Sequence, residues 1–143
     1  MALNKNKGKL YACYYNLPSL KDSLGGIAEF DLNTFNELRR WKLDASSITL
    51  STTGDTLFFF KDNSISLLKL NGVNPQPQPF IENPDKNETW YSLSYSAYGN
   101  TLWVGDAKNF QINGSLLIYD INVPGTIKYQ FQTGINPNKI LFF

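Results

Sequence analysis

The chain has 143 residues, of which 42% are hydrophobic and 15% aromatic, so it holds enough apolar material for one domain with its own core and is not a disordered tail. Its formal net charge of +1 supplies no general field for nucleic acid or an anionic membrane surface, and neither is expected as a partner. The chain has no histidine and one cysteine, Cys13, which excludes a Ser-His-Asp triad, a Cys-His pair, an intrachain disulfide and a cysteine-rich zinc site within one copy.

Neither of two kinds of targeting segment is found in the sequence. No run approaches the about 18 consecutive apolar residues of a membrane span, so no membrane insertion is expected. The first residues lack the apolar run of a secretion signal, and we expect any export signal to lie upstream of them.

Strands are predicted along almost the whole chain, because apolar and polar residues alternate between turn residues. The first repeat is expected to hold strands at 10–15, 27–32 and 37–43, and the second at 48–52, 56–61, 65–70 and 80–81. The third is expected to hold strands at 91–97, 101–106, 115–121 and 127–133, and a lone strand at 139–143 follows. A proline-rich stretch, 74–79, precedes the short strand at 80–81, which favours an outer position where missing backbone donors matter least.

A short phrase of glycine, a polar residue, leucine and an aromatic residue returns three times. It occurs at 8–11 (GKLY), 54–58 (GDTLF) and 99–103 (GNTLW). Leu10 and Leu57 are 47 residues apart, and Leu57 and Leu102 are 45 apart. This spacing is the length of one four-stranded blade of a β-propeller. The sequence therefore predicts an all-β propeller segment, a single domain over 1–143 with repeats at 8–47, 48–90 and 91–137 and a closing strand at 138–143.

The strands of a propeller blade are named A to D from the axis outward, and this chain is predicted to run BCD, ABCD, ABCD, A. Three blades are fewer than the about four to eight of known rings, and an open arc would expose two apolar faces. The ring is therefore expected to close in one of two ways. A second copy could complete a six-bladed homodimer, each terminal strand completing the partner's first blade, or further blades could belong to a longer chain.

Three segments, 10–16, 26–34 and 134–140, resemble the YVTN-type repeats of bacterial surface-layer-like β-propellers. Those repeats combine a strand ending in Leu-Tyr-Val, an Asp-x-x-Thr turn and a Gly-x-x-Pro step into the next inner strand. The literal Tyr-Val-Thr-Asn signature is absent here, and the full turn occurs only at 31–34. The resemblance implies a periplasmic or cell-surface protein that binds rather than catalyses, and it names no ligand.

Ligand contacts are expected on the loops from B to C and from D to A, which open on one face of a propeller. The loops at 16–25 and 106–114 are long enough to present side chains. The acidic residues are scattered singly among loops, so no catalytic, cofactor-binding or metal-ligating residue is expected, and a structural calcium ion is the one alternative left open. The candidate ligand-binding residues are Asn16, Asp22, Trp90, Asp106, Lys108 and Phe110. Trp90 has a second interpretation, as the first residue of an inner strand.

Three functions follow as hypotheses from this sequence. The leading one is a non-enzymatic binding or scaffold module of an exported bacterial protein, with a protein or glycan ligand. The first alternative is a propeller hydrolase or lactonase-like enzyme, which the lack of histidine and the dispersed carboxylates disfavour. The second is a WD40-like intracellular adaptor, suggested by the segments 102–106 and 115–120, although the Gly-His and Trp-Asp dipeptides of that class are absent.

Overall fold

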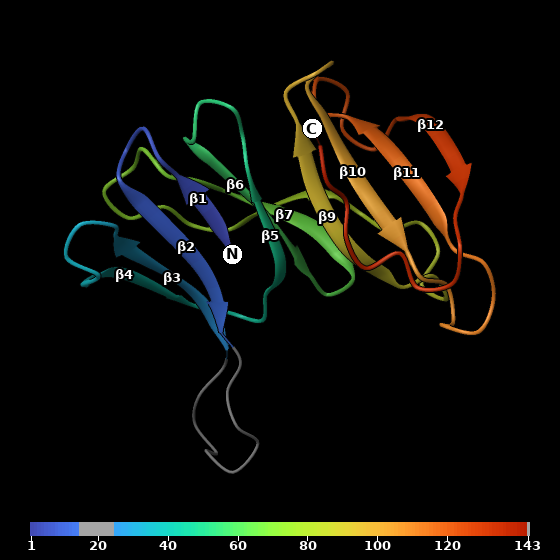
Figure 1. Ribbon diagram of the computed structural model, residues 1–143, viewed down its shortest axis with the longest axis horizontal. Coiled ribbons are helices and arrows are strands. Elements are labelled where there is room, and N and C mark those ends of the chain that lie inside the picture. The colour runs from blue at the N-terminus through green and yellow to red at the C-terminus, as the bar shows by residue number, and fades with distance from the viewer. Residues whose placement is uncertain (15–24, 143) are drawn as a thin grey trace, which may run out of the picture.

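The computed structural model describes residues 1–14 and 25–142, and the strands in them form three separate four-stranded antiparallel sheets (Figure 1). The first sheet consists of β1 (Ala2–Asn4), β2 (Lys9–Tyr14), β3 (Gly26–Asp31) and β4 (Glu37–Lys42). The second consists of β5 (Ser46–Leu50), β6 (Thr56–Lys61), β7 (Ser64–Lys69) and β8 (Gln78–Ile81). The third consists of β9 (Trp90–Ser96), β10 (Thr101–Asp106), β11 (Ser115–Asp120) and β12 (Ile127–Gln132). Within these ranges, no helix is long and apolar enough to cross a bilayer.

The prediction of an all-β propeller segment with three four-stranded blades is confirmed, but its strand phase is wrong at both ends. The first blade already has an innermost strand, because β1 pairs with β2 and places Leu3 opposite Leu10. Three residues are too few to show the alternation by which strands are recognised in a sequence. The lone strand expected at 139–143 is also not formed, since residues 139–142 lie outside any strand. The described blades therefore run ABCD, ABCD, ABCD.

Successive side chains along each strand of the second blade point to opposite faces of its sheet, and each face contributes to a separate apolar core. Leu57, Phe59 and Leu68 point toward the first blade, where they pack in one cluster with Tyr11 and Trp41. Their strand neighbours point the other way and pack against the third blade in a second cluster. That cluster includes Phe58, Phe60, Ile65, Leu67, Trp90, Leu102, Val104, Leu117 and Tyr119. Each such side chain contributes about 1.5–3 kcal/mol when fully buried, so the middle blade is held on both faces.

The repeated glycine of the sequence lies in the turn between the innermost and second strands of each blade. Gly8, Gly54 and Gly99 have φ angles of 61°, 65° and 70°, a left-handed conformation that side chains with a Cβ atom disfavour. In the second blade this turn also contacts the first, because the buried Asn4 side chain donates a hydrogen bond from Nδ2 to the Gly54 carbonyl at 2.9 Å. The glycine phrase therefore reflects turn geometry and, at Gly54, close packing between blades.

Replacing Gly54 by alanine should destabilise the protein by about 3 kcal/mol, from a left-handed backbone and a clash between blades. A Cβ atom at this position would lie 2.0 Å from Asn4 Nδ2. Gly125→Ala is the matched control, since Gly125 also has a positive φ, 86°, but a Cβ atom there would meet nothing within 4 Å. The control should lose only about 1–2 kcal/mol in urea unfolding. Equal losses for the two variants would contradict the close contact with Asn4.

Candidate functional site

One side of the molecule, here called the loop face, collects the connections from second to third strands and from one blade to the next. Neighbouring strands in each sheet are antiparallel, so the second and fourth strands of a blade both end on the side opposite the turn after β1, β5 or β9. The connections that follow these two strands therefore leave from the same side. The described loops on this face are 43–45, 62–63, 82–89, 107–114 and 133–138 (Figure 1).

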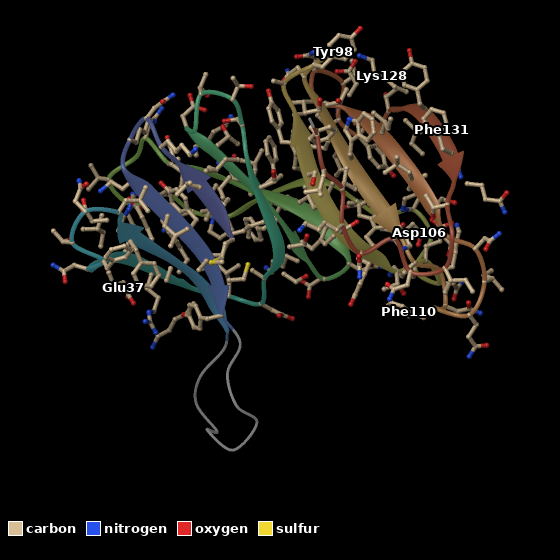
Figure 2. All side chains as sticks on the ribbon, in the orientation of Figure 1. Glu37, Tyr98, Asp106, Phe110, Lys128 and Phe131 are labelled. Atoms are coloured by element: carbon tan, nitrogen blue, oxygen red, sulfur yellow. The ribbon has the colours of Figure 1, made fainter. Side chains whose placement is uncertain are left out.

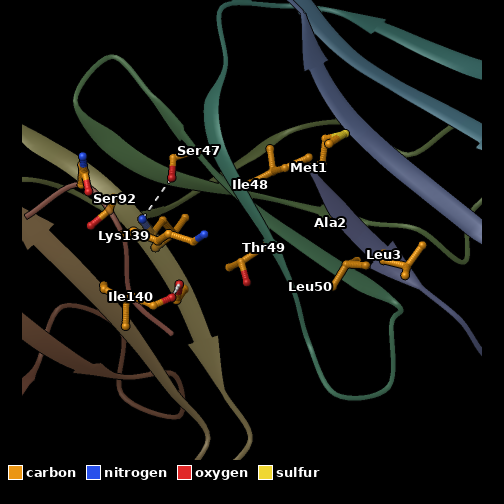
Figure 3. A pocket seen from close by; sticks show the side chains of 13 residues that line it. Met1, Ala2, Leu3, Ser47, Ile48, Thr49, Leu50, Ser92, Lys139 and Ile140 are labelled. Atoms are coloured by element: carbon orange, nitrogen blue, oxygen red, sulfur yellow. Dashed lines mark hydrogen bonds between the residues drawn. The ribbon is translucent and has the colours of Figure 1, made fainter. Parts of the chain in front are cut away.

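A groove of about 420 Å³ runs between the innermost strands of the three blades and the C-terminal segment 138–140 (Figure 3). Hydroxyl groups hold its walls together: the Leu93 amide donates to Ser47 Oγ and the Tyr95 amide to Thr49 Oγ1, both at 3.0 Å. Figure 3 shows Lys139 among the residues that line the groove between β5 and β9. We call this the axial groove.

The axial groove opens on the loop face through a second hollow of about 520 Å³, here called the mouth. The two share Ser47, Asn138 and Lys139 in their linings, and the mouth adds Tyr91. A third hollow of about 420 Å³ adjoins the mouth through shared Ser46 and Trp90. Its other lining residues are Asp44, Phe60, Lys61, Asp62, Asn63, Lys86, Glu88 and Thr89. The loop face therefore carries a connected depression rather than a flat surface.

An exposed aromatic pair borders the mouth. The rings of Tyr91 and Phe110 meet edge to face, with centroids 5.2 Å apart and planes at 88°, and each residue remains 44% exposed. Phe110 was predicted as a ligand contact from the length of its loop, whereas Tyr91 was missed. Its exposure results from a bulge, since Gly105 pairs with Ser92 and Asp106 with Trp90, which leaves Tyr91 as the extra residue. No sequence signal marks such a bulge.

The backbone of Phe110 lies in the left-handed region, with φ at 63°. This conformation is a strong outlier for a bulky residue and is found where surrounding contacts enforce it. Here the Phe110 amide donates to the Ala107 carbonyl at 2.9 Å, and the preceding Lys108 amide donates to Asp106 Oδ1 at 2.9 Å. The loop thus holds an apolar ring at the surface at an energetic cost.

Asp106 and Lys108, both predicted ligand contacts, instead join two loops of the loop face. Asp106 is fully buried, and its Oδ1 also accepts a hydrogen bond from the Thr89 amide at 3.1 Å. The Lys108 ammonium lies 2.8 Å from Asp106 Oδ2 and also pairs with the Glu88 carboxylate. These charges join segment 82–89 to segment 107–114 and so position the aromatic pair, with Asp106 closed to a ligand and Lys108 partly exposed. Figure 2 shows Asp106 and Phe110 at the same end of the third blade.

Trp90 occupies the core, as the second interpretation of its sequence position allowed. It is 4% exposed and packs with its ring centroid 6.1 Å from Phe60 and 5.6 Å from Tyr119. The other two candidates, Asn16 and Asp22, lie outside the described residues.

Reactive or metal-binding groups do not gather on the described surface. Burial raises the pKa of the Cys13 thiol to about 11, so it is protonated at neutral pH and behaves as a small apolar residue. Over residues 1–14 and 25–142, no three histidine, cysteine, aspartate or glutamate side chains come together as a metal site would require.

The Tyr119→Phe variant should be as stable as the natural chain or more stable by about 1 kcal/mol, because the buried Tyr119 hydroxyl has no hydrogen-bond partner among the described residues. Burial, with the charges of Glu88 and Asp106, raises the Tyr119 pKa to about 12. Ionisation of this hydroxyl therefore opposes folding: stability is unaffected below the unfolded pKa of about 10 and is lost as the pH rises toward 12. Tyr119→Phe should therefore lose less stability than the natural chain as the pH rises from about 10 toward 12.

Tyr95→Phe is the matched control for this measurement. The Tyr95 hydroxyl donates to Asn100 Oδ1 at 2.9 Å and accepts from Thr52 Oγ1 at 3.0 Å, so its removal should cost about 1 kcal/mol in urea unfolding. A loss at Tyr119→Phe as large as that at Tyr95→Phe would show that the Tyr119 hydroxyl has a partner, such as a buried water.

Comparisons with known proteins show the fold and leave the function open. No protein-family model matches the chain, and no curated protein matches it. Among solved structures, it is similar to a quinonprotein alcohol dehydrogenase-like protein from Bacteroides thetaiotaomicron, with a TM-score of 0.70 and 14% identity. The match covers 93% of this chain and 33% of that one, so this chain spans a third of that protein's length. The fold is that of a partial β-propeller.

Proposed function

We propose that this chain is a non-enzymatic binding or scaffold module whose ligand lies in the connected depression of the loop face. The observation that carries the proposal is the exposed edge-to-face pair of Tyr91 and Phe110 at the border of the mouth. Ligand-binding pockets are typically concave and lined by apolar and aromatic side chains, with a few polar groups that set orientation. The mouth offers such groups in the Ser47 hydroxyl, the Asn138 amide and the Lys139 amine.

The chemistry of the mouth favours a ligand that combines hydrogen-bonding groups with an apolar face. Glycans and extended protein segments both have this character. The similarity of three segments to YVTN-type repeats supports an exported, periplasmic or cell-surface location for such a module. The name of the similar solved structure refers to alcohol dehydrogenases, but 14% identity supports only a shared fold.

Substituting either ring of the aromatic pair should weaken ligand binding at least tenfold, about 1.4 kcal/mol, because each ring supplies exposed apolar contact area. The variants are Tyr91→Ala and Phe110→Ala, tested first on glycan and peptide arrays and then by titration calorimetry with the glycan or peptide that the natural chain retains. Tyr98→Ala is the control: Tyr98 is 91% exposed but lies at the opposite end of the third blade from Phe110 (Figure 2), so its loss should leave binding unchanged.

Two results would overturn this function. One is unchanged binding in both Tyr91→Ala and Phe110→Ala, since that would place the ligand away from the aromatic pair. The other is an absence of binding on both arrays, combined with turnover in a screen of lactone and ester substrates with and without calcium, which would favour the hydrolase alternative.

A further inference from the structure

The arc of three blades ends in two sheet faces that no other blade covers. Within the third blade, Leu117 packs toward the second blade, so its strand neighbours Leu116 and Ile118 point to the opposite, outer face. Their cross-strand partners on β12 are Phe131 and Tyr129, which share that face. This face of the third blade, the leading face, consists of Trp103, Leu116, Ile118, Tyr129 and Phe131.

The opposite end of the arc carries the corresponding face of the first blade. Tyr11 packs toward the second blade, so Leu10 and Ala12 point outward. Their cross-strand partners are Phe30 and Ala28, and Leu3 of β1 lies opposite Leu10. This face, the trailing face, consists of Leu3, Leu10, Ala12, Ala28 and Phe30.

Both end faces are copies of faces that are already packed between blades. The pair Leu10–Phe30 of the trailing face corresponds in register to Leu57–Leu68 in the second blade. In the third blade it corresponds to Leu102–Tyr119. Leu57, Leu68 and Leu102 are 0% exposed and Tyr119 is 2% exposed, because a preceding blade covers each of them. The trailing face therefore has the pattern of a blade interface and lacks its neighbour among the described residues.

The C-terminal segment occupies the place of an innermost strand in front of the leading face. Ser92 Oγ donates to the Pro137 carbonyl at 2.7 Å, across 45 residues, and Ser94 Oγ donates to the Ile140 carbonyl at 3.2 Å, across 46 residues. The bonds that join β5 to β9, Ser47 to Leu93 and Thr49 to Tyr95, also span 46 residues.

The same segment reaches the leading face itself. Phe142 packs edge to face on Trp103, with ring centroids 5.0 Å apart. The segment thus continues the blade interface beyond the third blade.

We propose that a second copy of this chain seats its trailing face on the leading face, and that two such contacts close a six-bladed ring of two chains. Large aromatic side chains on the leading face would meet the smaller Ala12 and Ala28 of the trailing face. One two-fold operation covers all four end faces, and six blades lie within the about four to eight of known rings.

The mass of the full chain in solution, measured by light scattering after size exclusion, tests this assembly independently of any ligand. The natural chain should have twice its 16.2 kDa mass. Phe131→Glu on the leading face and Ala12→Glu on the trailing face should each raise the dimer dissociation constant at least about 100-fold, because each change places a charge in both contacts. Phe131 is 53% exposed in the single chain, so Phe131→Glu should fold normally by circular dichroism.

Val73→Glu is the control, because Val73 is fully exposed and lies in the loop before β8, away from both end faces. This variant should remain a dimer. A natural chain that stays monomeric, an assembly larger than two copies, or a dimer that survives both end-face variants would overturn the proposal. A monomer would leave further blades, such as those of a longer chain, as the alternative cover for these faces.

Discussion

Packing of one blade against the next holds this molecule together. The described strands form three separate sheets, and no strand of one sheet pairs with a strand of another. Cohesion between the blades therefore rests on side chains, chiefly the two apolar layers on either side of the second blade. A strand whose two faces are both buried in this way must be apolar at every position, which explains the run Leu57-Phe58-Phe59-Phe60 in β6.

A few side-chain hydrogen bonds set how the innermost strands lie relative to one another. Asn4 joins the first blade to the turn at Gly54, and the Ser47 and Thr49 hydroxyls join β5 to β9. Apolar layers alone have little directional preference, whereas these bonds require one register between neighbouring blades. The axial groove exists because the inner strands are held by side chains and remain too far apart to pair as a sheet.

The candidate site depends on the same junctions. The ion pairs of Lys108 with Asp106 and Glu88 join the loop within the third blade to the segment that enters it from the second. Trp90, the residue before Tyr91, packs between Phe60 of the second blade and Tyr119 of the third. The exposed rings of Tyr91 and Phe110 therefore stand on a base formed by both blades. Loops on such a rigid support can present side chains at little further cost in conformational entropy.

Features that arise from local repetition can be predicted from the amino-acid sequence. The blade length, the strand alternation, the turn at Gly54 and the side on which the loops gather all follow from period-two patterning and from residues that must adopt a positive φ. Each of these depends on neighbours a few residues away or on the spacing between repeats, so each could be read before the structure was known.

Which residues reach the surface, and how the blades end, depends on contacts between strands and loops. Trp90 and Asp106 resembled exposed loop residues but are buried by the adjoining blade, while Tyr91 is turned outward by a bulge that pairs two residues against one. β1 was missed because three residues carry no alternation. The strand expected at 139–143 is not formed over 139–142, and Ser92 and Ser94 instead bond the carbonyls of Pro137 and Ile140. These outcomes depend on contacts between different strands and loops, and the alternation within one strand does not encode such contacts.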